Sequence, residues 1–119
     1  MQRPSEGELG ISRRTVGSAT VIAAAGDVDL RTAPSLRDAV TTTVDQVASG
    51  PYVLDLTNVT FLGSTGLTVL LAAHAYVADR GDVLRIVVDS NRPVIRPIEI
   101  TGLDTTLNLY HTVDEAIGR

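Results

Sequence analysis

The chain of 119 residues, 44% of them hydrophobic, is long enough for one compact domain with a single core and too short for two. A formal net charge of −4, with no Trp and only one Phe, argues against a nucleic-acid surface, which needs clustered cations and aromatic rings. The absence of Cys excludes disulfides and thiolate chemistry, which fits a reducing compartment.

The first eight residues are polar and contain no apolar run that could serve as a signal sequence. We expect residues 1–8 to be a flexible tail and residues 9–119 to form the domain. No apolar run elsewhere approaches the roughly 18 residues needed to span a bilayer. The sequence therefore predicts a cytoplasmic protein that does not enter a membrane.

The first elements read as a hairpin followed by a helix. Residues 9–15 alternate loosely, residues 16–18 turn, and residues 19–25 form a more buried second strand, which Gly26-Asp27-Val28-Asp29 is expected to stop. Thr32, with Pro34 in the first turn, predicts a helix start. The apolar stripe of this helix is Leu36, Val40, Val44 and Val47. Gly50 follows the helix as a C-cap, and Pro51 prevents its continuation.

The central stretch predicts a buried strand at residues 52–56, a polar turn at residues 57–63 and a second helix. We expect Ser64 or Thr65 to be the N-cap of this helix. Apolar spacings of three and four place one set of residues on its buried face: Leu67, Leu70, Leu71, His74 and Val77.

The last third predicts a strand at residues 83–88, a helix at residues 91–101 disturbed by Pro97, an edge strand at residues 107–110, and a final turn capped by Thr112. Strands separated by helices imply parallel crossovers. The fold class is therefore α/β: a single domain with a mixed sheet of about five strands, an N-terminal hairpin strand, and helices packed against the sheet.

The start of the central helix is the first candidate for a functional site. Free backbone N–H groups and the helix dipole favour an anion there, so a hydroxyl at this place suits the addition or removal of a phosphate. A nucleotide-binding P-loop is excluded, because Gly63 stands where that loop needs Lys. Spacing alone leaves open whether Ser64 and Thr65 are modified or only cap a helix.

Asp27 and Asp29 are the second candidate. They could be a metal pair, but they lack a third ligand, so we expect no metal site. Their loop and the turn at residues 57–63 both leave the carboxyl ends of strands, where open α/β sheets bind partners. We therefore assign both carboxylates to a partner-binding surface, with Asp27 facing the hydroxyls.

Neither histidine indicates catalysis. His74 lies on the apolar face of the central helix, which favours a hydrogen-bonded core residue over a base, and His111 has no nucleophile indicated beside it. Because nothing assembles a nucleophile, a base and an orienting group, we expect no enzyme and no cofactor.

Three segments together resemble the STAS family, and more narrowly its bacterial anti-sigma factor antagonists. They are Gly26-Asp27-Val28-Asp29-Leu30, the central stretch from Asp55 through Gly63-Ser64-Thr65-Gly66 to Leu67, and Thr101-Gly102-Leu103-Asp104. Their order and spacing match the family over nearly the whole chain from Leu9.

The resemblance implies a partner-switching protein. In this family the unmodified antagonist binds an anti-sigma factor kinase and releases a sigma factor, and phosphorylation at the start of the central helix ends that binding. The family's acceptor is the second hydroxyl of an Asp-Ser-Ser-Gly or Asp-Ser-Thr-Gly turn. That position is Thr65 here, Ser64 precedes it, and Gly63 stands in place of the usual Asp.

The partner-binding residues implied by the family and by the loops are Asp27, Asp29, Gly63, Ser64, Thr65 and Gly66. The partner is expected to be the anti-sigma factor kinase, and the chain to be a monomer or weak dimer that makes no direct contact with nucleic acid. Two alternatives remain: a constitutive STAS adaptor that is not phosphorylated, and a small anion- or nucleotide-binding module that uses the turn at residues 63–66.

Overall fold

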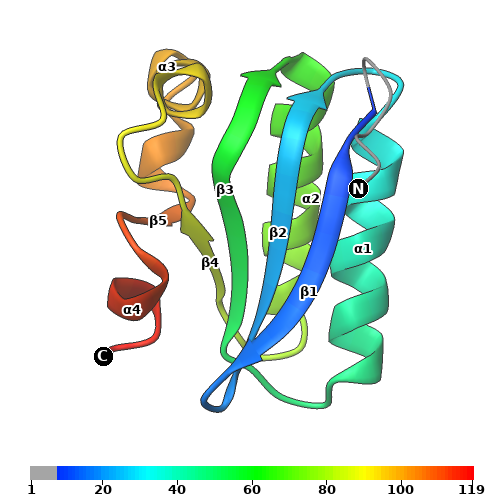
Figure 1. Ribbon diagram of the computed structural model, residues 1–119, viewed down its shortest axis with the longest axis vertical. Helices are drawn as coiled ribbons and strands as arrows, with labels where there is room; N and C mark the ends of the chain where they lie inside the picture. The colour runs from blue at the N-terminus through cyan, green and yellow to red at the C-terminus, as the bar shows by residue number, and fades with distance from the viewer. Residues whose placement is uncertain (1–7) are drawn as a thin grey trace, which may run out of the picture.

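The structure is a computed structural model that describes residues 8–119 (Figure 1). The predicted tail therefore lies, except for Glu8, outside the described residues. Five strands form one sheet in the order β1-β2-β3-β4-β5. The strands are β1 Gly10–Val16, β2 Ala19–Val28, β3 Tyr52–Leu62, β4 Leu84–Val87 and β5 Asn108–Tyr110. The helices are α1 Ala33–Gln46, α2 Ser64–Ala78, α3 Arg92–Ile100, η1 Leu103–Thr105 and α4 Val113–Ala116.

The sheet is mixed, as the sequence predicts. β1 pairs antiparallel with β2 through the turn at Gly17, and the three remaining pairs are parallel. The parallel strands are joined by helices, and α1 and α2 lie side by side behind the sheet (Figure 1). This arrangement confirms the predicted α/β class.

Alternation along the strands divides the core into two faces. Leu54 and Leu56 of β3 point into the main cluster, which α1 and α2 cover. Val53 of the same strand points to the opposite face of the sheet, into a second cluster. Ala116 of α4 packs in that second cluster. Thr112 caps α4 as predicted, since its hydroxyl accepts a hydrogen bond from the Glu115 N–H at 3.0 Å.

Two strands are longer than predicted. β2 does not stop at Gly26 but continues to Val28, with register shifts on both sides of Gly26, whose φ of +115° suits only glycine. β3 runs on to Leu62, so residues 57–62 are strand and not turn. Polar residues in this extension read as a turn in the sequence, but they pair with β2 as a ladder. Both strands therefore end side by side, at Val28 and Leu62.

The register of α2 is partly different from the predicted one. Leu70 and Val77 are fully buried, but Leu71 is 36% exposed. His74 is only half-buried, and its Nδ1 atom is buried without a hydrogen-bond partner, so the expectation of a hydrogen-bonded core histidine is wrong. The buried face is instead Gly66, Val69, Leu70, Ala73 and Val77. α3 includes Pro97 and remains one α-helix over its whole length.

Candidate partner-binding edge at the start of helix α2

The carboxyl ends of β2 and β3 are joined directly. The N–H of Gly63 donates a hydrogen bond to the carbonyl of Val28 at 3.0 Å, immediately after β3 ends. The loop that leads to α1 and the start of α2 therefore begin from one fixed point. This connection is what brings the two sequence-predicted sites to the same edge of the sheet.

The N-cap of α2 is Gly63, so the prediction that Ser64 or Thr65 caps the helix is wrong. Within residues 8–119 no side-chain cap hydrogen bond is made at this end of the helix, and Ser64 and Thr65 are instead its first two residues. Their place in the first turn keeps them beside free backbone N–H groups. A capping role is therefore not what explains the two hydroxyls.

Gly66 fixes how closely α2 approaches the strands. A Cβ atom at this position would lie 2.6 Å from Leu62 Cδ1 and 2.8 Å from Val28 Cγ1. Such contacts are too short for any side chain, so the helix can start this near the strand ends only with glycine here. The close approach holds the first turn of α2 against both strands.

The two hydroxyls differ in accessibility. Ser64 is exposed, whereas Thr65 is half-buried and lines a groove of about 650 Å³ between α1 and α2. Within residues 8–119 neither side-chain oxygen takes part in a hydrogen bond. Both hydroxyls are therefore available to an external group.

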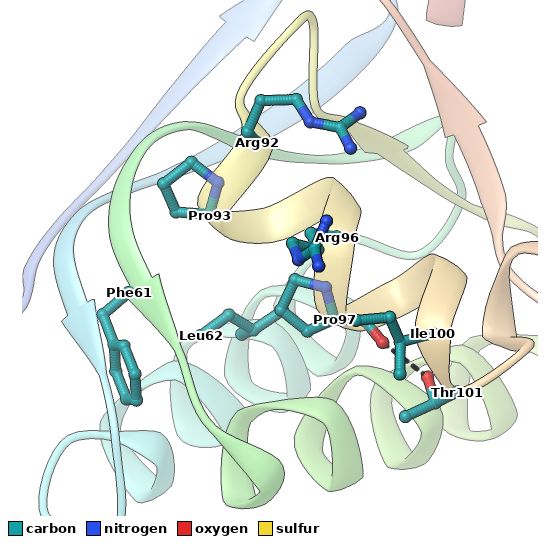
Figure 2. Close-up of a pocket in the computed structure, with 8 residues that line it drawn as sticks. All are labelled: Phe61, Leu62, Arg92, Pro93, Arg96, Pro97, Ile100 and Thr101. Atoms are coloured by element: carbon teal, nitrogen blue, oxygen red, sulfur yellow. Dashed lines mark hydrogen bonds between the residues drawn. The ribbon is translucent and has the colours of Figure 1, made fainter.

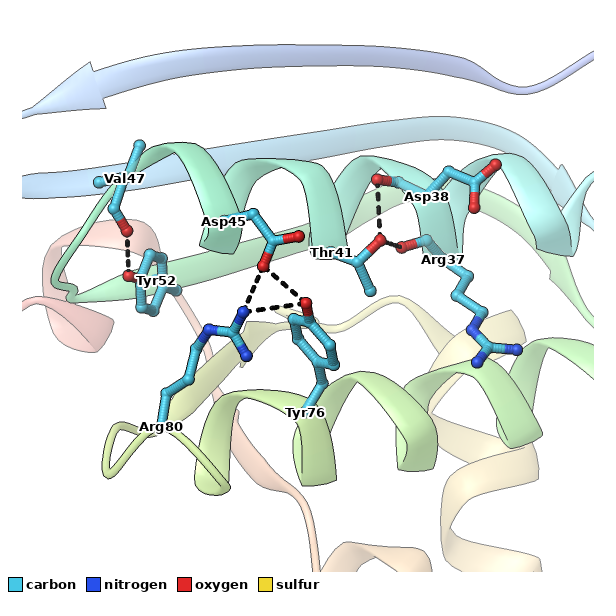
Figure 3. Close-up of polar contacts among 8 residues, drawn as sticks. All are labelled: Arg37, Asp38, Thr41, Asp45, Val47, Tyr52, Tyr76 and Arg80. Carbon is cyan, nitrogen blue, oxygen red and sulfur yellow. Dashed lines mark hydrogen bonds and ion pairs between the residues drawn. The ribbon is translucent and has the colours of Figure 1, made fainter.

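The groove between α1 and α2 carries charge along its length. Arg37 reaches from α1 towards α2 (Figure 3), and the groove is also lined by Leu30, whose side chain is 79% exposed. At its other end Asp45 forms an ion pair with Arg80 and accepts a hydrogen bond from the Tyr76 hydroxyl at 2.6 Å. That hydrogen bond raises the pKa of Tyr76. This triad ties α1 to α2 and leaves the end near Thr65 open.

Asp29 shapes the loop that precedes α1. Its Oδ1 accepts hydrogen bonds from the N–H groups of Arg31 and Thr32, at 3.0 and 3.1 Å. The bond from the Thr32 N–H is the main reason that the pKa of Asp29 lies below its ordinary value. The Thr32 hydroxyl donates in turn to the Asp27 carbonyl at 2.7 Å. One carboxylate oxygen of Asp29 is therefore already used inside the turn.

Asp27 is held on the strands. Its Oδ1 accepts a hydrogen bond from the Thr60 hydroxyl on β3 at 2.6 Å. The structure thus brings Asp27, Asp29 and residues 63–66 to one edge of the sheet, while giving Asp27 a strand partner rather than a bond to Ser64 or Thr65. Among residues 8–119, no three His, Asp or Glu side chains gather closely enough to hold a metal ion.

A second groove, which sequence reasoning missed, lies on the other side of the α2 start. It has a volume of about 610 Å³ and is formed between the end of β3 and α3 (Figure 2). Phe61 and Leu62 come from β3, and the other wall is α3. The available signal in the sequence was Phe61, the single Phe of the chain, and the structure leaves it 51% exposed.

Asn91 positions the second groove. β3 pairs with β4 only as far as Asp55, so later carbonyls on that side of β3 have no strand partner among the described residues. The Asn91 amide donates to two of them, those of Leu56 and Val59, at 2.9 and 2.7 Å. Since Asn91 is the N-cap of α3, these bonds set the helix beside the end of β3.

Comparison with known proteins identifies the family. The STAS domain model matches residues 11–116, which is nearly all of the described chain. The chain belongs to the STAS domain family. The edge described above, where β2 and β3 end and α2 begins, lies within the residues that match the STAS domain.

Relatives of this STAS domain include anti-sigma factor antagonists. The anti-sigma-F factor antagonist RsfB of Mycobacterium tuberculosis is 36% identical over 99 residues, covering 82% of this chain and 77% of RsfB. The crystal structure of an anti-sigma factor antagonist from Mycobacterium paratuberculosis has a TM-score of 0.81 and 33% identity, covering 92% of both chains.

A more distant structure shares the STAS fold. SpoIIAA in its unphosphorylated form has a TM-score of 0.70 at 20% identity, covering 92% of this chain and 95% of SpoIIAA. The phosphorylated form of SpoIIAA, from Bacillus, has a TM-score of 0.64 at the same identity, covering 92% of this chain and 98% of that one. In the described residues of this STAS domain, no helix is both long and apolar enough to cross a bilayer.

Proposed function

We propose that this STAS domain is an anti-sigma factor antagonist that binds an anti-sigma factor kinase and is released from it by phosphorylation of Thr65. The observation that carries the proposal is a pair of hydroxyls in the first turn of α2, at the edge where β2 and β3 end, that make no hydrogen bond within residues 8–119. The names of RsfB and of the Mycobacterium paratuberculosis protein support the antagonist role. On this proposal the protein acts in the cytoplasm, has no catalytic activity of its own, and is a monomer or weak dimer.

A phosphate at Thr65 is compatible with the fold. The first turn of a helix offers free N–H groups and the positive end of the dipole, both of which stabilise a group of charge about −2. Phosphorylation should therefore leave the domain folded.

The effect of the phosphate falls on the interface instead. A hydroxyl that packs against a partner is neutral, whereas a phosphate must be desolvated among groups arranged for that neutral side chain. A penalty of about 3 kcal/mol would already weaken binding by more than a hundredfold. The same half-buried position of Thr65 that makes it a contact residue thus makes it a switch.

Ser64 is the other acceptor to be tested. It is more exposed than Thr65 and precedes it in the same turn. Thr65 is favoured because it is the second hydroxyl of the family's turn and lines the groove between α1 and α2. SpoIIAA, which has this fold, is described in both unphosphorylated and phosphorylated forms.

The deciding experiment is intact-mass analysis after incubation with each anti-sigma factor kinase of the same genome and ATP. We expect a single phosphate on the parent and on Ser64→Ala, and none on Thr65→Ala. Thr65→Ala should still bind the kinase, while Thr65→Glu should fold normally and bind at least about tenfold more weakly. Loss of phosphate in Ser64→Ala alone would move the acceptor to Ser64.

If the parent gains no phosphate with any of these kinases, and Thr65→Glu binds as tightly as the parent, the switch is wrong. The protein would then act as a constitutive STAS adaptor.

A further inference from the structure

The groove between the end of β3 and α3 has a composition that selects its ligand. Among the residues that the structure describes, its lining is apolar except for three and contains no Asp or Glu. Ile100 is 71% exposed and Phe61 is 51% exposed, so the apolar surface is open to solvent. Large exposed apolar side chains grouped in a groove indicate a binding surface rather than scattered surface residues. This groove plays no part in the proposed switch at Thr65.

Neutral polar groups in the lining are already used or absent. The hydroxyl of Thr101 donates to the carbonyls of Pro97 and Ile98, at 2.7 and 3.1 Å. Pro93 and Pro97 lack a backbone N–H. The groove therefore presents apolar surface and, as its exposed charged side chains, the guanidinium groups of Arg92 and Arg96.

Two arginines stand one helical turn apart on the rim of the groove. Arg92 and Arg96 both come from α3 (Figure 2). Within residues 8–119 Arg96 has no acidic partner, and Arg92 has only a loose ion pair with exposed Glu99 at 3.7 Å. Their spacing of four residues places their Cβ atoms about 6 Å apart on the same side of α3. In a chain whose net charge is −4, this is a local cationic site beside an apolar surface.

We propose that this groove binds an acidic amphipathic helix of a partner protein. Such a helix would place an apolar stripe against Phe61, Pro97 and Ile100. Carboxylates at its i and i+4 positions would match the spacing of Arg92 and Arg96. Helix-in-groove binding uses this combination of apolar anchors and flanking charges. The proposal is independent of whether Thr65 is phosphorylated.

Charge complementarity argues for this occupant over two others. A second copy docked groove to groove would bring its own arginines against Arg92 and Arg96, which is repulsive. A single alkyl carboxylate could pair with one guanidinium only: bound to Arg96, it would leave Arg92 with nothing but its 3.7 Å contact with Glu99. A helix with two carboxylates satisfies both arginines and covers the exposed apolar wall.

The test uses a fluorescein-labelled peptide of about 18 residues, long enough for five helical turns. It carries Leu at spacings of three and four and Glu on both sides of that stripe. A matched peptide carries Gln at every Glu position. Fluorescence anisotropy with the unphosphorylated full chain, at about 0.05 M and about 0.3 M salt, measures both affinities.

The acidic peptide should bind saturably, more weakly at the higher salt, and at least about tenfold more tightly than the Gln peptide. Arg96→Glu and Ile100→Ser should each reduce its affinity at least about tenfold. Both side chains are exposed, so these variants should keep the parent's melting temperature. Arg14→Glu on β1 and Val83→Ser, exposed residues outside the groove, are the matched controls and should bind as the parent does.

Several results would overturn the proposal. No saturable binding, equal affinity for the Gln peptide, or parent-like affinity of Arg96→Glu and Ile100→Ser would each do so. A dimer in light scattering that Ile100→Ser dissociates would assign the groove to a second copy. Dodecanoate binding that depends on Arg96, without binding of the acidic peptide, would assign it to an alkyl carboxylate. The proposed switch would survive all of these outcomes, because none involves Thr65 or a kinase.

Discussion

The ring of Phe61 lies so close to Gly63 that a Cβ atom at Gly63 would come 3.1 Å from Phe61 Cε2. The backbone of Gly63, with φ −85° and ψ −179°, is accessible to any residue, so the ring is the obstacle to a side chain here. Phe61 is half-exposed and can move by the few tenths of an ångström that a Cβ requires. The family's usual Asp should therefore be accepted at this position.

Gly63→Asp should raise the free energy of unfolding by up to about 1 kcal/mol. An Asp at the N-cap can accept a hydrogen bond from the first turn of α2, and the loss of glycine reduces the entropy of the unfolded chain. Urea denaturation measures the change, and Gly63→Ala separates the entropy effect from the cap. A lower stability for both variants would mean that the Phe61 ring cannot yield.

Gly66→Ala should destabilise the fold by about 1–3 kcal/mol, because the new methyl group has no room against Leu62 and Val28. The comparison with Gly63→Ala, in the same stretch of chain, isolates this steric effect from the general effect of replacing glycine. Thermal melting is sufficient to measure it. A parent-like melting temperature for Gly66→Ala would show that α2 can move away from the strand ends.

Leu70→Ala should destabilise the domain by about 2–5 kcal/mol, because Leu70 is fully buried between α2 and the sheet. Its neighbour Leu71 is 36% exposed, so Leu71→Ala should cost less than about 1 kcal/mol. Urea denaturation of the pair checks the register of α2. Equal effects, or a larger effect at Leu71, would contradict the register described above.

Asp29→Asn tests the turn before α1 through its pH dependence. The folded-state pKa of Asp29 lies below the ordinary value of 3.8, so the ionised form contributes stability above pH 3.8 and loses it as the pH falls through the folded pKa. The variant should be less stable than the parent near neutral pH, and the difference should shrink in acid. Asp38→Asn, an exposed carboxylate on α1, is the control. If the difference in stability between Asp29→Asn and the parent did not change with pH, the ionisation of Asp29 would not be what stabilises this turn.

Asp27→Ala should weaken binding to the anti-sigma factor kinase, most strongly at low salt, if the loop charge contacts the partner. The substitution also removes the hydrogen bond from Thr60. Thr60→Val removes the same bond and keeps the charge, so it should bind as the parent does. Titration calorimetry of both variants distinguishes the two effects. Equal loss in the two would show that the hydrogen bond, and not the charge, matters.

The order and type of the elements could be predicted from the sequence because periodicity and helix-start residues are local signals. The ends of β2 and β3 could not. Gly26 reads as a strand end, but its positive φ lets the strand pass through a bulge. Thr57 and Asn58 read as turn residues, yet β2 supplies a neighbour that pairs with this stretch.

The candidate site could be predicted only in part, because some of its residues are neighbours in the chain and others meet only in the fold. The hydroxyls at positions 64 and 65 follow each other in the chain, so their place at a helix start was visible. The groove of Phe61 and Ile100 joins residues that are far apart in sequence, and the fold brings them together through the bonds of Asn91 to β3 and the burial of α3 residues in the core. Leu71 shows a related limit: α2 is apolar on several sides, so spacing alone does not select the buried one.

Because of the bonds from Asn91 to β3, the shape of the sheet and the shape of the groove beside α3 depend on different interactions. The sheet holds its own shape through strand pairing, whereas the groove beside α3 depends on the Asn91 amide in addition to the buried Val94 and Ile98 of α3. Related chains that differ at this position could therefore share the same sheet and the same α2 start, yet present grooves of different widths. Partner choice could then diversify without any change to the turn that carries Thr65.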